Sequence, residues 1–520
     1  MKESLKKQII RMIALLAAIA LVIGIFASIF LTDVYAEEET RLTGTTADEW
    51  TALFDRRDKS NKRTWLGADG IFSIPLDGYD AFASATKESK TFFIFSDTLT
   101  GSARGNGSID NLHMPNHTGA LLTGDAPTNE ALSFFLGKGN NGNIEQNLFV
   151  DYRCWMLDGF VSGNFLYLFG FSASDDWKPQ DIELFKLPLK NGEPDWEAYD
   201  RYNETVKVPS LFHRDGQYLY AFGIGITANT VSAGAIDPDG YIYLYGYRDA
   251  LREGSRKDLI VARIKETDLD DFSKVTYFDG TSWSTDITAS APLLSSVSCE
   301  LSVTPVTVGP YAGKYIAVYT KNCEGADVMY AIGDSLTGPF SDPVAFYRAP
   351  EQGTAGTSGK GSRYCYNAKA HPALSSGTKL LISYNINNRC SNMAENLWTI
   401  DYHPRFLWLD LDPLGTTKSV TSDLFEVADG LIEVPEGTSA ADALAHLTCS
   451  DASSALSVAA AGALGTDTLL SVRQSGITLA TFAVVLRGDV TGDARILADD
   501  LTALARHGSF IEPFPVGSAR

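Results

Sequence analysis

The feature of the sequence that most constrains the fold is a set of short aromatic and β-branched runs that recur at a long, nearly constant spacing. The starts of the five runs are separated by 74, 75, 74 and 65 residues: residues 92–95, 166–169, 241–245, 315–319 and 380–384. The last four follow turn-forming segments within a few residues, for example Ser162-Gly163-Asn164 before the second run. Each of these four is therefore predicted to be the second strand of a hairpin.

The runs are almost continuously apolar, which indicates strands that are covered on both faces. Further strand candidates follow them at residues 182–187, 259–264, 275–278, 328–331 and 344–347. A recurring unit of about four antiparallel strands is typical of a propeller blade, because each blade needs its neighbours to bury both faces. A β-sandwich is disfavoured, since it lacks such a long period. We therefore predict an all-β fold, a five-bladed β-propeller over residues 46–411.

The N-terminus predicts export. Four basic residues precede an uncharged, predominantly apolar run at residues 12–31, and Val34-Tyr35-Ala36 places small residues at a cleavage site, so residues 1–36 are read as a signal peptide. The run is also long enough for an uncleaved anchor. Either way the protein is expected to be secreted or at the cell surface. A net charge of -21 without a Lys/Arg cluster excludes nucleic acid as a partner.

The six cysteines show no metal-ligand spacing. Two pairs would each lie within one hairpin region, Cys299 with Cys323 and Cys365 with Cys390. The sequence leaves open whether these pairs form disulfides or whether the cysteines are free thiols in a β core.

Three carboxylates are candidate catalytic groups. Asp69 precedes the predicted strand from residue 71 and Asp97 follows the strand that ends at residue 95, so antiparallel pairing brings both to one rim. Glu300 precedes an inner strand of another unit, and such positions converge around a propeller axis. Paired carboxylates are the groups that glycoside hydrolysis requires, one as an acid and one as a base or nucleophile. The alternative is that the aspartates only bond backbone amides in turns.

Four further residues are candidate contacts to a sugar in the same funnel: Trp155, Asp158, Asn367 and His371. Each has a structural alternative. Trp155 would serve equally in core packing, Asp158 in an Asp-Gly turn and His371 as a hydrogen-bonded core residue. No GxSxG motif is present, so Ser-His-Asp catalysis has no support. No cofactor is expected for catalysis.

Several of these segments together resemble a known family. Residues 65–76, 92–99, 154–169, 300–305, 366–372 and 403–406 are similar to a bacterial family of five-bladed propellers that was long classed as of unknown function and includes endo-D-arabinanases. The resemblance implies that Asp69 and Asp97 take part in catalysis and that the substrate is a furanoside-containing polysaccharide such as arabinan. This chain has Ser96 where the family usually has glycine. The alternative function is a non-catalytic, carbohydrate-binding propeller at the cell surface.

The C-terminal segment shows a second resemblance. Residues 488–501 are similar to one dockerin repeat, a Ca²⁺ loop followed by a helix, and dockerins bind cohesins on scaffold proteins. The resemblance implies a set of loop ligands: Asp489, Thr491, Asp493, Arg495 through its carbonyl, and Asp500. Only one repeat is present, and Ala494 stands where glycine is usual. We therefore expect a partial dockerin-like segment over residues 487–520, with Ca²⁺ as its ion and a cohesin-bearing scaffold as its partner.

Residues 412–423, with a proline, a glycine and paired threonines, are predicted to be a linker. Residues 424–486 are predicted to form a small α+β spacer module. Its helix is expected at residues 439–447, with Thr438 or Ser439 as the cap of the first turn.

Overall fold

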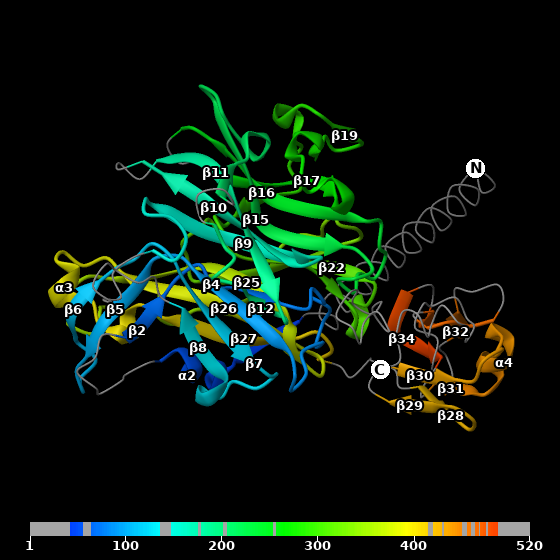
Figure 1. Cartoon of the computed structure of the whole chain (residues 1–520). Helices are drawn as coiled ribbons and strands as arrows, with labels where there is room; N and C mark the ends of the chain where they lie inside the picture. Colours follow the sequence, from blue (N-terminus) through cyan, green and yellow to red (C-terminus); the bar gives the residue numbers. More distant parts are fainter. Residues whose placement is uncertain are drawn as a thin grey trace, which may run out of the picture.

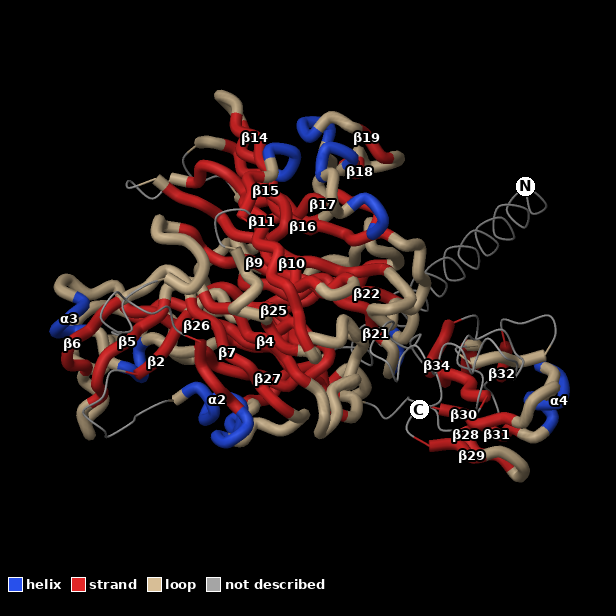
Figure 2. Tube along the Cα trace, viewed as in Figure 1, coloured by secondary structure: helices blue, strands red, loops and turns tan. Residues whose placement is uncertain are grey.

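The computed structural model describes residues 42–55, 64–135, 147–174, 178–200, 205–252, 256–413, 420–428, 431–449, 455–458, 463–466, 468–474 and 477–486. These residues form mainly strands (Figures 1 and 2), and the all-β prediction is confirmed. The predicted signal peptide and the dockerin-like loop with Asp489, Thr491, Asp493, Arg495 and Asp500 lie outside the described residues. Within the ranges above, no helix is long and apolar enough to cross a membrane.

Five antiparallel sheets make up most of the described chain. The first sheet contains β3 (Phe72–Pro75), β4 (Lys90–Phe95), β7 (Thr118–Thr123) and β8 (Leu132–Phe135). The second contains β9 (Cys154–Ser162), β10 (Phe165–Ala173) and β11 (Pro179–Lys190), with β12 (Glu193–Pro194) and β13 (Thr205–Lys207) both paired to β11. The third is built on β15 (Tyr218–Asn229), β16 (Tyr241–Ala250) and β17 (Lys257–Lys265), extended by β14 (Phe212–Arg214), β18 (Thr276–Phe278), β19 (Trp283–Ser284) and β20 (Leu294–Val297).

The fourth sheet contains β21 (Leu301–Val306), β22 (Lys314–Thr320), β23 (Asp327–Gly333) and β24 (Val344–Arg348). The fifth contains β25 (Arg363–Ser376), β26 (Lys379–Asn388), β27 (Pro404–Asp410) and, on its edge, β1 (Thr43–Thr46) from the other end of this part of the chain. β1 pairs with β27, so the fifth sheet joins two segments that are far apart in sequence.

The five hydrophobic runs lie in the second strands of the hairpins β3–β4, β9–β10, β15–β16, β21–β22 and β25–β26. This confirms the prediction made for the last four runs from the turn-forming segments before them. At the second and fifth hairpin turns the backbone takes a positive φ at a glycine, 56° at Gly163 and 59° at Gly377. Glycine adopts this conformation without steric cost. The first strands contact one another in cyclic order, β3 with β9, β9 with β15, β15 with β21, β21 with β25 and β25 with β3.

The second strands are covered on both faces, which confirms that expectation. In β10, Leu166 and Leu168 belong to a hydrophobic cluster shared with the first sheet, whereas Tyr167 and Phe169 belong to a cluster shared with the third sheet. Alternate side chains of a strand point to opposite faces, so both neighbouring sheets are needed to bury this one strand. The core is therefore a series of layers between sheets.

A smaller three-stranded sheet is inserted beside the first sheet and consists of β2 (Thr64–Ala68), β5 (Thr98–Ala103) and β6 (Ile109–His113). There are two short α-helices beside these sheets in the described residues. α2 (Asp48–Phe54) contacts β27 of the fifth sheet, and α3 (Met393–Asn396) contacts β6 of the three-stranded sheet. Short 3₁₀ segments occur in connections: η1 (Asn129–Ala131), η2 (Pro209–Leu211), η3 (Glu266–Asp268), η4 (Phe272–Lys274), η5 (Ile287–Ala289), η6 (Gly309–Tyr311) and η7 (Thr399–Asp401).

The described residues between 420 and 486 form a separate group of strands beside the five sheets (Figure 1). β28 (Val420–Ser422) pairs with β31 (Leu447–Cys449), and a second sheet has the order β29 (Glu426–Ala428), β30 (Leu431–Val434), β34 (Ile477–Leu486), β33 (Leu469–Gln474), β32 (Ala455–Val458). The helix predicted here is α4 (Ala440–Ala445), and Ser439 caps it because its hydroxyl accepts from the Asp442 N–H at 3.1 Å. The expected helix and its cap are confirmed.

Candidate active site

A cavity of about 680 Å³ is lined by residues that lie within the strands of the five sheets or in the segments next to them. Its wall includes the three carboxylates proposed from the sequence, Asp69, Asp97 and Glu300. It also includes aromatic and amide side chains that suit a sugar: Trp155, Tyr247, Tyr364, Tyr366, Asn367, Asn387 and Tyr402. The structure therefore brings the three candidate catalytic carboxylates together in the wall of one cavity.

Asp69 and Asp97 are held side by side by their own backbones. The N–H of Asp69 donates to the carbonyl of Asp97 at 3.1 Å, and the N–H of Ser96 donates to the carbonyl of Asp69 at 2.9 Å. These bonds extend the pairing of β3 with β4, which places Phe72 opposite Ile94. The hydroxyl of Ser96 donates to the Met156 carbonyl of the second sheet at 2.9 Å, so this departure from the resembled motif links two sheets.

The carboxylate of Asp69 is bound on one side only. Its Oδ2 accepts from the hydroxyl of Tyr366 at 2.8 Å and from the hydroxyl of Tyr402 at 2.9 Å, whereas Oδ1 is buried without a hydrogen-bond partner. Burial raises the pKa of Asp69 well above its ordinary value, and the carboxylates of Asp97 and Glu300 raise it further. The two tyrosine hydroxyls oppose this shift because they stabilise the ionised form. Asp69 is thus a carboxyl group that favours its proton.

Asp97 has surroundings that favour its charge more strongly. Its Oδ1 accepts from the side-chain amide of Asn116 at 2.9 Å. Burial raises the pKa of Asp97, but hydrogen bonds from Asn116 and Trp155 and the positive charge of Arg153 all act against the rise. Two neighbouring carboxyl groups therefore differ in environment, which is how acid and base roles are separated at neutral pH.

Glu300 forms a buried ion pair with Lys369. Its Oε2 lies 2.5 Å from the Lys369 Nζ and its Oε1 accepts from the Asn367 amide at 2.7 Å. The side chains of Lys369 and Glu300 are 1% and 10% exposed. Burial raises the pKa of Glu300, and the ammonium group of Lys369 opposes that rise. Asn367 reaches Glu300 from a bulge in β25, where its φ is +59°.

Asp158 and His371 are not brought to the cavity wall. The Asp158 carboxylate accepts from its neighbour Gly159 and from Ile226 of the third sheet, at 2.8 and 2.7 Å, and burial raises its pKa to about 7. His371 is fully buried, its two ring nitrogens each lie 2.8 Å from a serine hydroxyl, and burial lowers its pKa to about 3. Both residues link neighbouring sheets through hydrogen bonds.

Glu300 directly precedes its inner strand, as the sequence predicts, but the polar candidates of the second and fifth sheets lie within the inner strands themselves. Asp158 lies inside β9, and Asn367 and His371 lie inside β25, which begins at Arg363. The inner strands tolerate polar side chains within their length because bulges interrupt the pairing there, between Leu168 and Gly170 in one case and between Tyr366 and Lys369 in the other.

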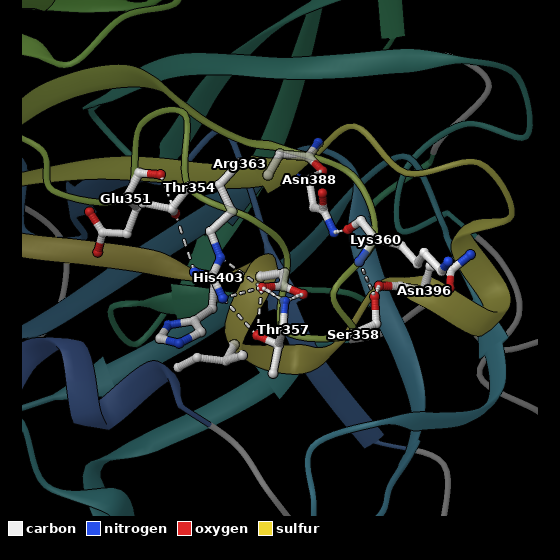
Figure 3. Close-up of polar contacts among 12 residues, drawn as sticks. Glu351, Thr354, Thr357, Ser358, Lys360, Arg363, Asn388, Asn396 and His403 are labelled. Atoms are coloured by element: carbon white, nitrogen blue, oxygen red, sulfur yellow. Dashed lines mark hydrogen bonds and ion pairs between the residues drawn. The ribbon is translucent and has the colours of Figure 1, made fainter.

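Thr357 and Arg363 belong to a network of polar contacts (Figure 3). Both bind Asp401, which directly precedes Tyr402 in the chain. Asp401 is fully buried, and its Oδ1 accepts from the Thr357 hydroxyl and from Arg363 Nε, both at 2.8 Å. The loop after β24 is anchored further because the Asn388 amide donates to the Lys360 carbonyl at 3.0 Å. The network therefore positions one of the two donors to Asp69.

Two residues that shape the site, Tyr402 and Lys369, are not identified in the sequence as functional, and for Tyr366 the sequence favours core packing over stacking on a sugar. Tyr366 and Tyr402 lie 297 and 333 positions from Asp69 along the chain, and Lys369 lies 69 positions from Glu300. Tyr402 has no local motif that sets it apart from other buried residues. A lysine in an otherwise buried inner strand, in the run Tyr366-Asn367-Ala368-Lys369, was the one available signal.

All six cysteines are free thiols in the structure. The sulfur atoms of Cys299 and Cys323 lie 3.0 Å apart, and both line the cavity. Cys365 and Cys390 pack in different hydrophobic clusters, so the structure does not bring the second suggested pair together. Across the described ranges, no group of three or more His, Cys, Asp or Glu side chains is arranged to hold a metal ion.

Comparison with known proteins gives one family match. The model of a family described as "Domain of unknown function (DUF5005)" matches residues 49–410, which is more than half of the chain. No curated protein matches the sequence.

Solved structures give more distant matches. A protein from Bacteroides ovatus ATCC 8483 named as a hydrolase is 20% identical, with a TM-score of 0.49, and the match covers 70% of this chain and 90% of that one. A thermostable family-43 glycoside hydrolase is 14% identical, with a TM-score of 0.31 and coverage of 71% and 95%. A GH43_1 enzyme from Xanthomonas citri in complex with xylose is 14% identical, with a TM-score of 0.32 and coverage of 65% and 90%.

Proposed function

The chain belongs to the DUF5005 family, and from its cavity we propose that it is a glycoside hydrolase. The observation that carries the proposal is the pair Asp69 and Asp97, joined through their backbones on one wall of a cavity large enough for sugar rings, with Glu300 in the same wall. Hydrolysis of a glycosidic bond needs a carboxylic acid and a carboxylate on either side of the bond. Water supplies the hydroxyl group to the cleaved sugar, and the two carboxyl groups supply the acid and the base or nucleophile.

Asp69 is the proton donor in this proposal. Its pKa is raised well above the ordinary value, its Oδ2 is occupied by two tyrosine hydroxyls, and its Oδ1 has no protein partner. Asp69 is therefore the carboxyl group that holds a proton, which it can pass to the oxygen of the leaving sugar. Asp97, which hydrogen bonds stabilise as an anion, is the base or nucleophile. Glu300 forms an ion pair with Lys369, and its carboxylate raises the pKa of Asp69 further.

For the substrate we propose a furanoside-containing polysaccharide such as arabinan, with Trp155 and Asn367 as contacts in the cavity. The resemblance described above supports this class. The cyclic contacts of β3, β9, β15, β21 and β25 support a five-bladed propeller as the scaffold, with residues 420–486 as a spacer. We further propose that the protein is exported by residues 1–36 and that residues 487–520 bind Ca²⁺ and a cohesin-bearing scaffold.

The test is release of sugar by the purified chain and by its Asp69→Asn and Asp97→Asn variants. Loss of a general acid or base typically lowers kcat about 10²- to 10⁴-fold, while binding of the polysaccharide is expected to persist. Asp110→Asn is the matched control, because Asp110 is a partly exposed carboxylate paired with Arg104 outside the cavity. A wild-type protein that binds a furanoside polymer but releases no oligosaccharide would instead be a carbohydrate-binding propeller.

The role of Asp69 has its own test. A substrate with a phenolate leaving group needs no proton, so Asp69→Asn should keep more activity on 4-nitrophenyl arabinofuranoside than on arabinan. If Glu300→Gln shows this selective retention and Asp69→Asn does not, then Glu300 is the acid.

A further inference from the structure

Two cysteines meet in the wall of the candidate active site. The sulfurs of Cys299 and Cys323 are 3.0 Å apart, and the Cys323 Sγ also lies 3.8 Å from the Val297 carbonyl. Both side chains line the cavity, so small molecules in the cavity can reach them. Cys299 directly precedes Glu300 in the chain, which places the pair next to one of the three carboxylates.

The backbone around the pair suits a cross-link. Cys299 lies just before β21, and Cys323 lies in the turn between β22 and β23. The turn is already docked on the segment before β21, since the N–H of Asn322 donates to the Ser296 carbonyl at 2.9 Å. Asn322 and Cys323 have φ values of +62° and +69°, a conformation that holds the Cys323 side chain toward its partner at a cost in backbone strain.

We propose that Cys299 and Cys323 form a reversible disulfide that fixes the backbone carrying Glu300 in the cavity wall. The importance of this for catalysis rests on the proposed function, but the cross-link itself does not. Without the bond, the segment from residue 296 to residue 300 is held to the turn by the Asn322–Ser296 hydrogen bond and by thiol contacts. With the bond, the end of β21 and the turn after β22 move as one unit.

The chemistry needs an external disulfide such as oxidised glutathione. The Cys323 thiolate attacks one sulfur of glutathione disulfide, which releases one glutathione thiolate and leaves a mixed disulfide. The Cys299 thiolate then attacks the Cys323 sulfur, forms the Sγ–Sγ bond and releases the second glutathione. The protein loses two electrons and two protons, and the glutathione disulfide gains them.

The local charges favour Cys323 as the attacking sulfur. The thiol hydrogen bond from Cys299 lowers the pKa of Cys323, against the effect of burial, and the ammonium group of Lys257 lowers it further. The same contact raises the pKa of Cys299. Lys257 is itself held 2.7 Å from the Asp249 carboxylate in the same wall.

The first experiment maps the bond by mass spectrometry. The full chain is equilibrated with oxidised glutathione, free thiols are blocked with N-ethylmaleimide, and the protein is digested without reduction. We expect a cross-linked peptide pair that contains Cys299 and Cys323 and is two hydrogens lighter than the two reduced peptides. Full alkylation of both cysteines, or a mixed glutathione disulfide on Cys323 that never resolves, overturns the proposal.

The second experiment tests what the bond holds in place. Reduction of the oxidised wild type should lower the Tm by about 5 °C and speed amide hydrogen exchange at residues 296–300 at least tenfold. The Cys299→Ser/Cys323→Ser variant should be insensitive to reduction, whereas Cys390→Ser, the matched control, should keep the full response. Unchanged exchange at residues 296–300 in the wild type overturns the positioning role. Neither readout needs a substrate, so failure here is distinct from failure of the glycosidase proposal.

Discussion

The buried ion pair between Lys369 and Glu300 allows a quantitative prediction for Lys369→Met. Methionine has a similar length and fills the space, but it leaves the Glu300 carboxylate, which is 10% exposed, without its cation. Removal of one partner from a buried pair typically costs about 3–5 kcal/mol, since the remaining charge is desolvated and unpaired. We expect a loss of that size in the free energy of unfolding at pH 8, measured by urea denaturation followed through tryptophan fluorescence.

Two comparisons isolate the charge from the packing. In the double variant Lys369→Met/Glu300→Gln no charge is left behind, so at least half of the lost stability should return. Lys314→Met is the matched control: Lys314 and Asp334 form an ion pair of similar length whose side chains are 38% and 60% exposed. Exposed pairs of this kind contribute at most about 1 kcal/mol.

The pH dependence has a defined sign. Without Lys369, the pKa of Glu300 in the folded state rises further above its unfolded value, so Glu300 binds a proton more tightly in the folded state. The penalty of Lys369→Met should then be largest at pH 8 and should shrink toward pH 4, where Glu300 is protonated. Equal losses in Lys369→Met and Lys314→Met, or a penalty that grows as the pH falls, would refute the reasoning.

Two further predictions concern groups near the cavity. Burial raises the pKa of Asp158 to about 7 in the folded state, so the stability that its protonated form contributes is lost as the pH rises. Between pH 5 and pH 7 the free energy of unfolding of the wild type should fall by up to about 3 kcal/mol relative to that of Asp158→Asn, as measured by urea denaturation. A flat difference between the two proteins would contradict this. Tyr402→Phe removes one donor to Asp69 Oδ2, which raises the pKa of Asp69, so the basic limb of the kcat/KM profile should move to higher pH. An unchanged or lower limb would argue against Asp69 as the acid.

The sequence predicts the strands of the hairpins better than it predicts the edge strand that pairs with the fifth sheet. The runs at residues 92–95 and 241–245 mark second strands because a strand buried on both faces needs apolar residues at every position, and this pattern is local. Asp69 and Asp97 could also be placed together from a local pattern, because they flank the hairpin of β3 and β4. The edge strand β1 could not be predicted, because Thr43–Thr46 is polar and mostly exposed and becomes a strand only through pairing with β27.

The side chains that set the chemistry of the site are not marked by local patterns. Tyr366 and Tyr402 resemble ordinary buried residues in sequence. The roles of these tyrosines and of Lys369 appear only when the fifth sheet contacts the first and fourth. Asp158 and His371 show the opposite case. Their residue types suggest chemistry, but backbone amides and serine hydroxyls occupy their polar atoms. Residue type identifies candidates, and only tertiary contacts separate functional groups from structural ones.

Contact of the fifth sheet with the first sheet supplies the hydrogen bonds that moderate the raised pKa of Asp69. The first sheet supplies Asp69 and Asp97, but both hydroxyls on Asp69 come from β25 and from the segment before β27. The approach is tight, because a Cβ added at Gly67 would fall 1.9 Å from the Tyr402 carbonyl oxygen. β1 holds this last sheet by pairing with β27. The environment of the proposed acid therefore depends on contact between the two ends of the five-sheet body, so stability of the closure and protonation of Asp69 are linked.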